Sequence, residues 1–163
     1  MCGENHGILT DIKAAGLGEV EREWLHLIRL HCTSYEHNRM EGLDCAMTHA
    51  EQRFGADQGP SIAARAAVLV RAMRTERHGT FGYLSPHCPV CSQRLTEDEW
   101  DLIVLMRAGY EGDRHEIARA AAYFARRPDA PVLAGAARRF GLTAAAAGPV
   151  ASAASVPASA RLH

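Results

Sequence analysis

Apolar residues recur along most of this chain three or four positions apart, which is the spacing of an amphipathic helix. This pattern predicts a first helix from about Glu19 to Thr33 and a second from about Arg39 to Phe54. The residues expected to face inward are Trp24, Leu27, Ile28, His31 and Tyr35 in the first helix, and Met40, Leu43, Met47, Ala50 and Phe54 in the second.

A third helix is predicted after residues 59–61, where Pro60 and Ser61 are typical of a helix start. It ends near Gly79. Its inward residues are expected to be Ile62, Ala66, Leu69, Val70 and Met73.

The clearest helix start in the sequence is at Thr96, in the stretch "LTEDEWDLIVLM". Thr96 and Glu99 have the spacing of a capping box, in which each side chain bonds the other residue's backbone N–H. The following segment, Trp100 to Met106, is apolar on nearly every side and is therefore expected to form a central, buried helix. We attribute the carboxylates of residues 97–99 to the helix dipole rather than to catalysis.

Two further helices are predicted, one from Asp113 to Pro128 and one that follows Asp129 as its N-cap and ends at residues 140–141. The fold class is therefore all-α, with about six short helices around a central buried helix. We expect a flexible lead-in at 1–18, one helical domain at 19–142 and a disordered Ala-rich tail at 143–163. Residues 79–95 are expected to form a loop or short hairpin.

Composition is typical of a soluble globular protein, with 163 residues, 47% hydrophobic, 23% charged and a net charge of −1. The near-zero charge gives no global indication of nucleic-acid or membrane binding, and no apolar stretch has membrane-spanning length. The N-terminus lacks the features of a secretory signal, so we expect a cytoplasmic protein. In that compartment, the five cysteines are better interpreted as ligands or inert thiols than as disulfides.

Cys88 and Cys91, in the stretch "HCPVC", have the separation at which two thiolates bind one ion from a tight turn. This predicts half of a tetrahedral zinc site in the loop 79–95. The alternatives are two ordinary cysteines or a redox pair. The redox interpretation is disfavoured because the predicted N-cap, Thr96, lies five residues past Cys91 and no βαβ pattern precedes it.

The remaining ligands are sought among Cys32, Cys45 and His49. Cys45 and His49 are four residues apart and share one face of the second helix, opposite its apolar stripe. Cys32 lies at the edge of the first helix's apolar face, where a small buried hydrophobe is its commonest role. His31 and His87 are further candidates; for His31 a core-edge position is the plainer interpretation.

Four thiolates, or three with His49, would hold one zinc ion and tie the first two helices to the loop. An iron–sulfur cluster is less favoured, since the cysteine spacing does not match compact cluster motifs. Catalytic zinc is disfavoured because "HEIAR" at 115–119 lacks the second histidine of H-E-x-x-H.

These features favour a small non-enzymatic zinc protein acting as an interaction or regulatory module, with structural metal and an unidentified protein partner. One alternative is an accessory protein that carries metal or Fe–S during metalloenzyme assembly. Another is a DNA-binding regulator, supported weakly by arginines at 71, 74, 77, 126, 127, 138 and 139. A homodimer joined through Cys45 and His49 is also considered, and no membrane association is expected.

Overall fold

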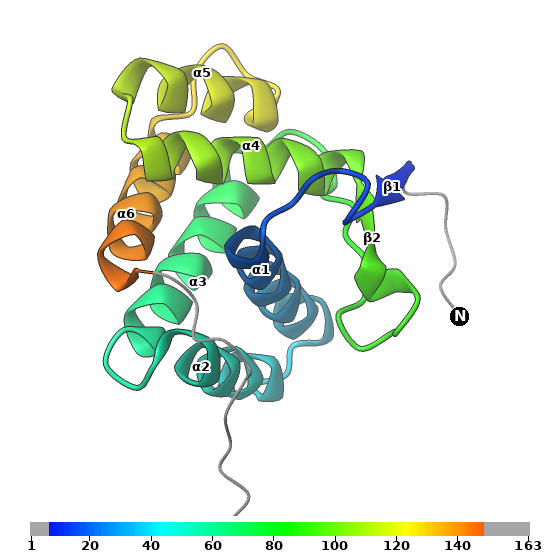
Figure 1. The fold of residues 1–163 in the computed structure, drawn as a ribbon. Helices are drawn as coiled ribbons and strands as arrows, with labels where there is room; N and C mark the ends of the chain where they lie inside the picture. Colours follow the sequence, from blue (N-terminus) through cyan, green and yellow to red (C-terminus); the bar gives the residue numbers. More distant parts are fainter. Residues whose placement is uncertain (1–6, 149–163) are drawn as a thin grey trace, which may run out of the picture.

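Six helices and a two-stranded sheet form the part of the chain that the structure, a computed structural model, describes: residues 7–148 (Figure 1). The helices are α1 (Glu19–His37), α2 (Glu41–Phe54), α3 (Gly59–Glu76), α4 (Glu97–Glu111), α5 (Arg114–Ala125) and α6 (Pro131–Ala147). The strands are β1 (Ile8–Asp11) and β2 (Arg94–Thr96), and a short 3₁₀ turn, η1 (Cys91–Gln93), precedes β2. The prediction of an all-α protein is confirmed at this level.

The helices pack as two groups of three. α1, α2 and α3 contact one another, and so do α4, α5 and α6. The groups meet where α3 packs on α6 and α1 on α4. Figure 1 shows α4 crossing the molecule between α5 on one side and the α1–α3 group on the other. No helix in residues 7–148 combines the length and the apolar character needed to cross a membrane.

α4 begins as the sequence predicts. The Thr96 hydroxyl accepts from the Glu99 N–H at 3.0 Å, and the Glu99 carboxylate accepts from the Thr96 N–H at 2.9 Å, which confirms the capping box. The central residues of the helix, Leu102 to Met106, are largely buried. The helix ends at Gly112, whose φ of 84° lies in the left-handed region that glycine adopts without strain.

The buried face of α2 differs from the predicted stripe. Ala46, Ala50 and Phe54 are buried, whereas Met40 and Met47 are exposed. Gly42 explains the rotation of this face, because a side chain there would collide with Ser34 and the Leu30 carbonyl of α1. The small residues let the two helices approach closely, so the larger methionines lie outside the contact.

α6 is longer than predicted and runs without interruption to Ala147. Residues 143–147, predicted as the start of the tail, are helical, whereas 149–163 lie outside the described residues. The sequence predicts a helix end at residues 140–141. In the structure Gly141 lies inside the helix against Gly109 of α4, where the missing side chain permits close helix packing.

The start of α6 is one residue later than predicted, with Ala130 rather than Asp129 at the N-cap. Backbone N–H groups in the first turn of α6 are hydrogen-bonded by a side chain from another helix. The Glu76 carboxylate, at the end of α3, accepts from the N–H groups of Val132 and Leu133 at 3.1 and 2.7 Å. A carboxylate at the positive end of α6 replaces the expected local cap and joins the two helix groups.

Part of the predicted flexible lead-in is structured. β1 pairs with β2 in antiparallel register, with Thr10 opposite Leu95 and Asp11 opposite Arg94. Ile12 and Leu17 then enter the hydrophobic core. Local periodicity could not indicate this pairing, because the partner strand lies more than 80 residues along the chain. The segment 79–95 accordingly forms no hairpin of its own within the described residues.

Candidate metal centre

The loop before α4 is anchored by a buried ion pair. Arg29 of α1 and Glu99 of α4 form a two-point contact, with Nε–Oε1 at 2.6 Å and Nη2–Oε2 at 2.8 Å, and their side chains are 2% and 0% exposed. The guanidinium also donates to the carbonyls of Ser92 and Arg94 at 3.2 and 2.6 Å. Glu99 in turn accepts from the Leu84 N–H at 3.1 Å. The Arg29–Glu99 pair therefore holds the backbone on both sides of the two cysteines, at Leu84 before them and at Ser92 and Arg94 after them.

Asp98 anchors the first half of the same loop. Its carboxylate accepts from the Gly82 N–H at 2.8 Å and pairs with Arg77 at 2.5 Å and with Arg126 at 3.3 Å. The Arg77 side chain is almost completely buried and also donates to the Phe124 carbonyl. The two carboxylates attributed to the helix dipole thus also position the loop, which the sequence analysis did not predict.

Cys88 and Cys91 lie in a tight turn on this anchored loop. The Cys91 N–H donates to the Cys88 Sγ at 3.4 Å, and the Ser92 N–H donates to the Cys88 carbonyl at 2.8 Å. Cys91 is buried, Cys88 is half-buried and Val90 between them is 64% exposed. The turn thus brings the two cysteines together, with the Cys91 N–H directed at the Cys88 sulfur and Cys88 half-exposed.

Cys32, a predicted candidate ligand, lies on α1 within the hydrophobic core. Burial, with a smaller contribution from the Glu99 carboxylate, raises the pKa of its thiol to about 12. A thiol with this pKa is protonated at neutral pH, whereas zinc binds the thiolate. In this arrangement Cys32 has the properties of a core residue.

Cys45 and His49 lie on α2, where Cys45 is exposed and His49 is half-buried. His49 is already engaged: its Nε2 lies 2.6 Å from the Glu23 Oε2 of α1, and its ring packs on His26 with centroids 4.4 Å apart. His26 was not among the candidate ligands. Its only sequence signal is its place one turn after Glu23, on a helix face that pattern analysis assigns to solvent.

Of the two further histidines considered, His31 is buried and its Nε2 lies 3.0 Å from the Ala63 carbonyl oxygen of α3. Burial lowers its pKa, so the neutral ring joins α1 to α3. His87, next to Cys88, is exposed.

Within residues 7–148, no three His, Cys, Asp or Glu side chains lie close enough together to hold one metal ion. The structure brings Cys88 and Cys91 together in one turn and His26 and His49 together on two helices. It does not gather Cys32, Cys45 and His49 around the cysteine turn. The predicted four-ligand set therefore stays a prediction.

The His26 environment predicts a pH dependence of stability. Burial and the neighbouring His49 lower the pKa of His26 from 6.5 to about 4. Because the unfolded chain binds this proton near pH 6.5, stability that is present above 6.5 is lost as the pH falls toward 4. We expect wild-type protein to lose about 1–2 kcal/mol more than His26→Gln over this range, allowing for partial exposure of the ring. Urea unfolding in the presence of a chelator measures this difference, and parallel curves for the two proteins would contradict it.

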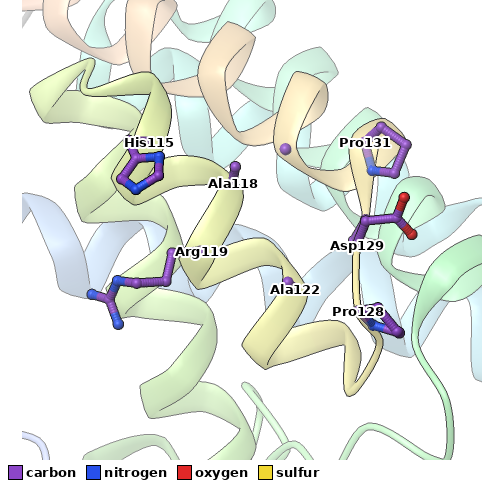
Figure 2. A pocket seen from close by; sticks show the side chains of 9 residues that line it. His115, Ala118, Arg119, Ala122, Pro128, Asp129 and Pro131 are labelled. Atoms are coloured by element: carbon purple, nitrogen blue, oxygen red, sulfur yellow. The ribbon is translucent and has the colours of Figure 1, made fainter.

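A separate groove of about 450 Å³ lies between α5 and the segment that leads into α6 (Figure 2). Its floor is formed by alanines, including Ala118 and Ala122, and its rim carries His115, Arg119 and Asp129. The Arg119 guanidinium is paired with Glu116 at 2.6 Å. The lining holds none of the candidate metal ligands.

Several of the arginines considered for DNA binding have roles in the fold. Arg77 and Arg126 pair with Asp98, and Arg74 lies 4.2 Å above the Tyr35 ring. These contacts reduce the set of cations available for a phosphate backbone. Packing and loop anchoring therefore account for three of the seven arginines, Arg74, Arg77 and Arg126.

Comparisons of this chain with protein-family models, with curated proteins and with solved structures found no match.

Proposed function

We propose that this protein is a small non-enzymatic zinc-binding helical protein, in which Cys88 and Cys91 supply two thiolate ligands and the surface around them contacts a partner protein. The observation that carries the proposal is the Cys88–Cys91 turn, in which the Cys91 N–H donates to the Cys88 Sγ. Two thiolates with this separation suit the tetrahedral, sulfur-preferring coordination of zinc.

An exchangeable ion suits this turn better than a purely structural one. The loop is already held by the Arg29–Glu99 pair and by Asp98, so no metal is needed to position it. Zinc takes four ligands, and the described residues place no third ligand beside the cysteines. The remaining positions would be taken by water or by a partner's side chains. This supports an accessory role in holding or transferring an ion.

Elemental analysis of protein purified without chelator tests the proposal. We expect about one zinc ion bound at this turn, and at least about tenfold weaker binding in Cys88→Ser and Cys91→Ser. Cys2→Ser is the matched control, because it removes a thiol that was not assigned as a ligand. Wild-type protein that contains no zinc and takes up none on addition would rule the proposal out.

Circular dichroism before and after chelation separates the two roles of the ion. An exchangeable ion predicts almost unchanged helicity once the metal is removed, because the ionic anchors remain. A structural ion predicts loss of helicity. Substituting Cys32, Cys45 and His49 one at a time then tests each as a further ligand, because loss of a ligand lowers zinc affinity.

A further inference from the structure

Two histidines from neighbouring helices meet on the surface between α1 and α2. The rings of His26 and His49 have centroids 4.4 Å apart and planes inclined at 48°. Both side chains are half-buried, so their outer edges reach solvent while their backbones are held by packed helices. The ring contact thus joins two rigid elements and does not depend on a loop.

Glu23 orients one of these rings. Its Oε2 lies 2.6 Å from the His49 Nε2, and its other oxygen, Oε1, is paired with Arg53 at 2.9 Å. A proton on Nε2, donated to this carboxylate, leaves the lone pair of the neutral ring on Nδ1. Histidines that bind metal commonly have such a carboxylate on their second nitrogen, which sets the tautomer and raises ligand basicity.

We propose that His26 and His49 form a second metal site, which uses neither cysteine of the turn and binds a borderline divalent ion such as Zn²⁺, Ni²⁺ or Cu²⁺. The two imidazoles are the ligands, Glu23 is a positioning residue and water completes the coordination. Imidazole nitrogen is a ligand that these ions share. In this proposal His49 binds the same ion as His26 and is not a ligand of the ion at Cys88 and Cys91.

The two imidazoles and the Glu23 carboxylate are more polar than a packing contact between two helices requires. Apolar side chains would fill the same space between two helices without removing imidazole edges from water. A carboxylate bonded to one imidazole and a second imidazole supplied by another helix are features of histidine metal sites. The inference is independent of the proposed zinc binding at Cys88 and Cys91, because it uses none of the same atoms.

The experiment uses the full chain with Cys88→Ser and Cys91→Ser, so that thiolate binding is removed. Ni²⁺ is titrated against a competing chelator. We expect this protein to bind Ni²⁺, and His26→Gln or His49→Gln to weaken the affinity by at least about tenfold. Glu23→Gln should weaken it by a smaller factor. His115→Gln, an exposed histidine on α5, is the matched control and should leave the affinity unchanged.

A second measurement uses the same Cys88→Ser/Cys91→Ser protein and does not depend on the folding of any histidine variant. Adding Ni²⁺ should broaden the ring resonances of His26 and His49 before those of the other histidines. Ni²⁺ affinity that is unchanged from the parent protein in both His26→Gln and His49→Gln, or broadening of His115 at the same Ni²⁺ concentration, would show a packing contact and overturn the inference. Loss of zinc at the cysteine turn alone would leave the inference intact.

Discussion

Replacing Glu99 with glutamine is expected to lower the free energy of unfolding by about 3–5 kcal/mol. The change removes one charge of a pair whose side chains are 2% and 0% exposed, so Arg29 is left buried without its counter-charge. The loss extends beyond the pair, because the carboxylate also accepts from the N–H groups of Leu84 and Thr96. The loop and the start of α4 should therefore loosen together.

Urea unfolding followed by circular dichroism measures this effect. Glu97→Gln is the matched control: it removes an exposed carboxylate from the same first turn, and we expect a loss of only a few tenths of a kcal/mol. The double variant Arg29→Met/Glu99→Gln should recover part of the stability, because no uncompensated buried charge remains. Equal losses for Glu97→Gln and Glu99→Gln would show that the pair does not anchor the loop.

Replacing Gly141 with alanine is expected to destabilise the protein by about 2–3 kcal/mol, although alanine favours helices. A methyl group on Gly141 would overlap the Gly109 carbonyl of α4, and one on Gly109 would overlap the Ala137 carbonyl of α6. The contact is between two backbones, so neither helix has a side chain that can move aside. α6 would have to move away from α4, which opens the core between them.

Gly135→Ala provides the comparison within the same helix. Its nearest neighbour would be the flexible end of Arg139, at 3.3 Å, so the substitution should be neutral or stabilise by up to about 1 kcal/mol. Thermal unfolding of the two variants side by side therefore separates helix propensity from helix packing. Equal melting temperatures for Gly141→Ala and Gly135→Ala would show that α4 and α6 do not approach each other closely at Gly109 and Gly141.

The local signals in the sequence determined the helices and their clearest boundary. The apolar spacing predicted the buried residues of α3, and the Thr96–Glu99 spacing predicted the start of α4, because a capping box is formed within four consecutive residues. The Cys88–Cys91 turn was likewise predictable, since its geometry depends on neighbouring residues.

Only the tertiary structure decided the contacts between distant segments. Gly141 lies at a position where the sequence predicts a helix end, yet it allows α6 to pack closely on α4 at Gly109. The start of α6 is capped by Glu76, which belongs to another helix. The sequence did not single out Arg29 or His26, because their partners, Glu99 and His49, lie 70 and 23 residues away along the chain. Periodicity reports which face of a helix is apolar. It does not report which polar groups meet when two faces pack, and the candidate metal ligands depend on that pairing.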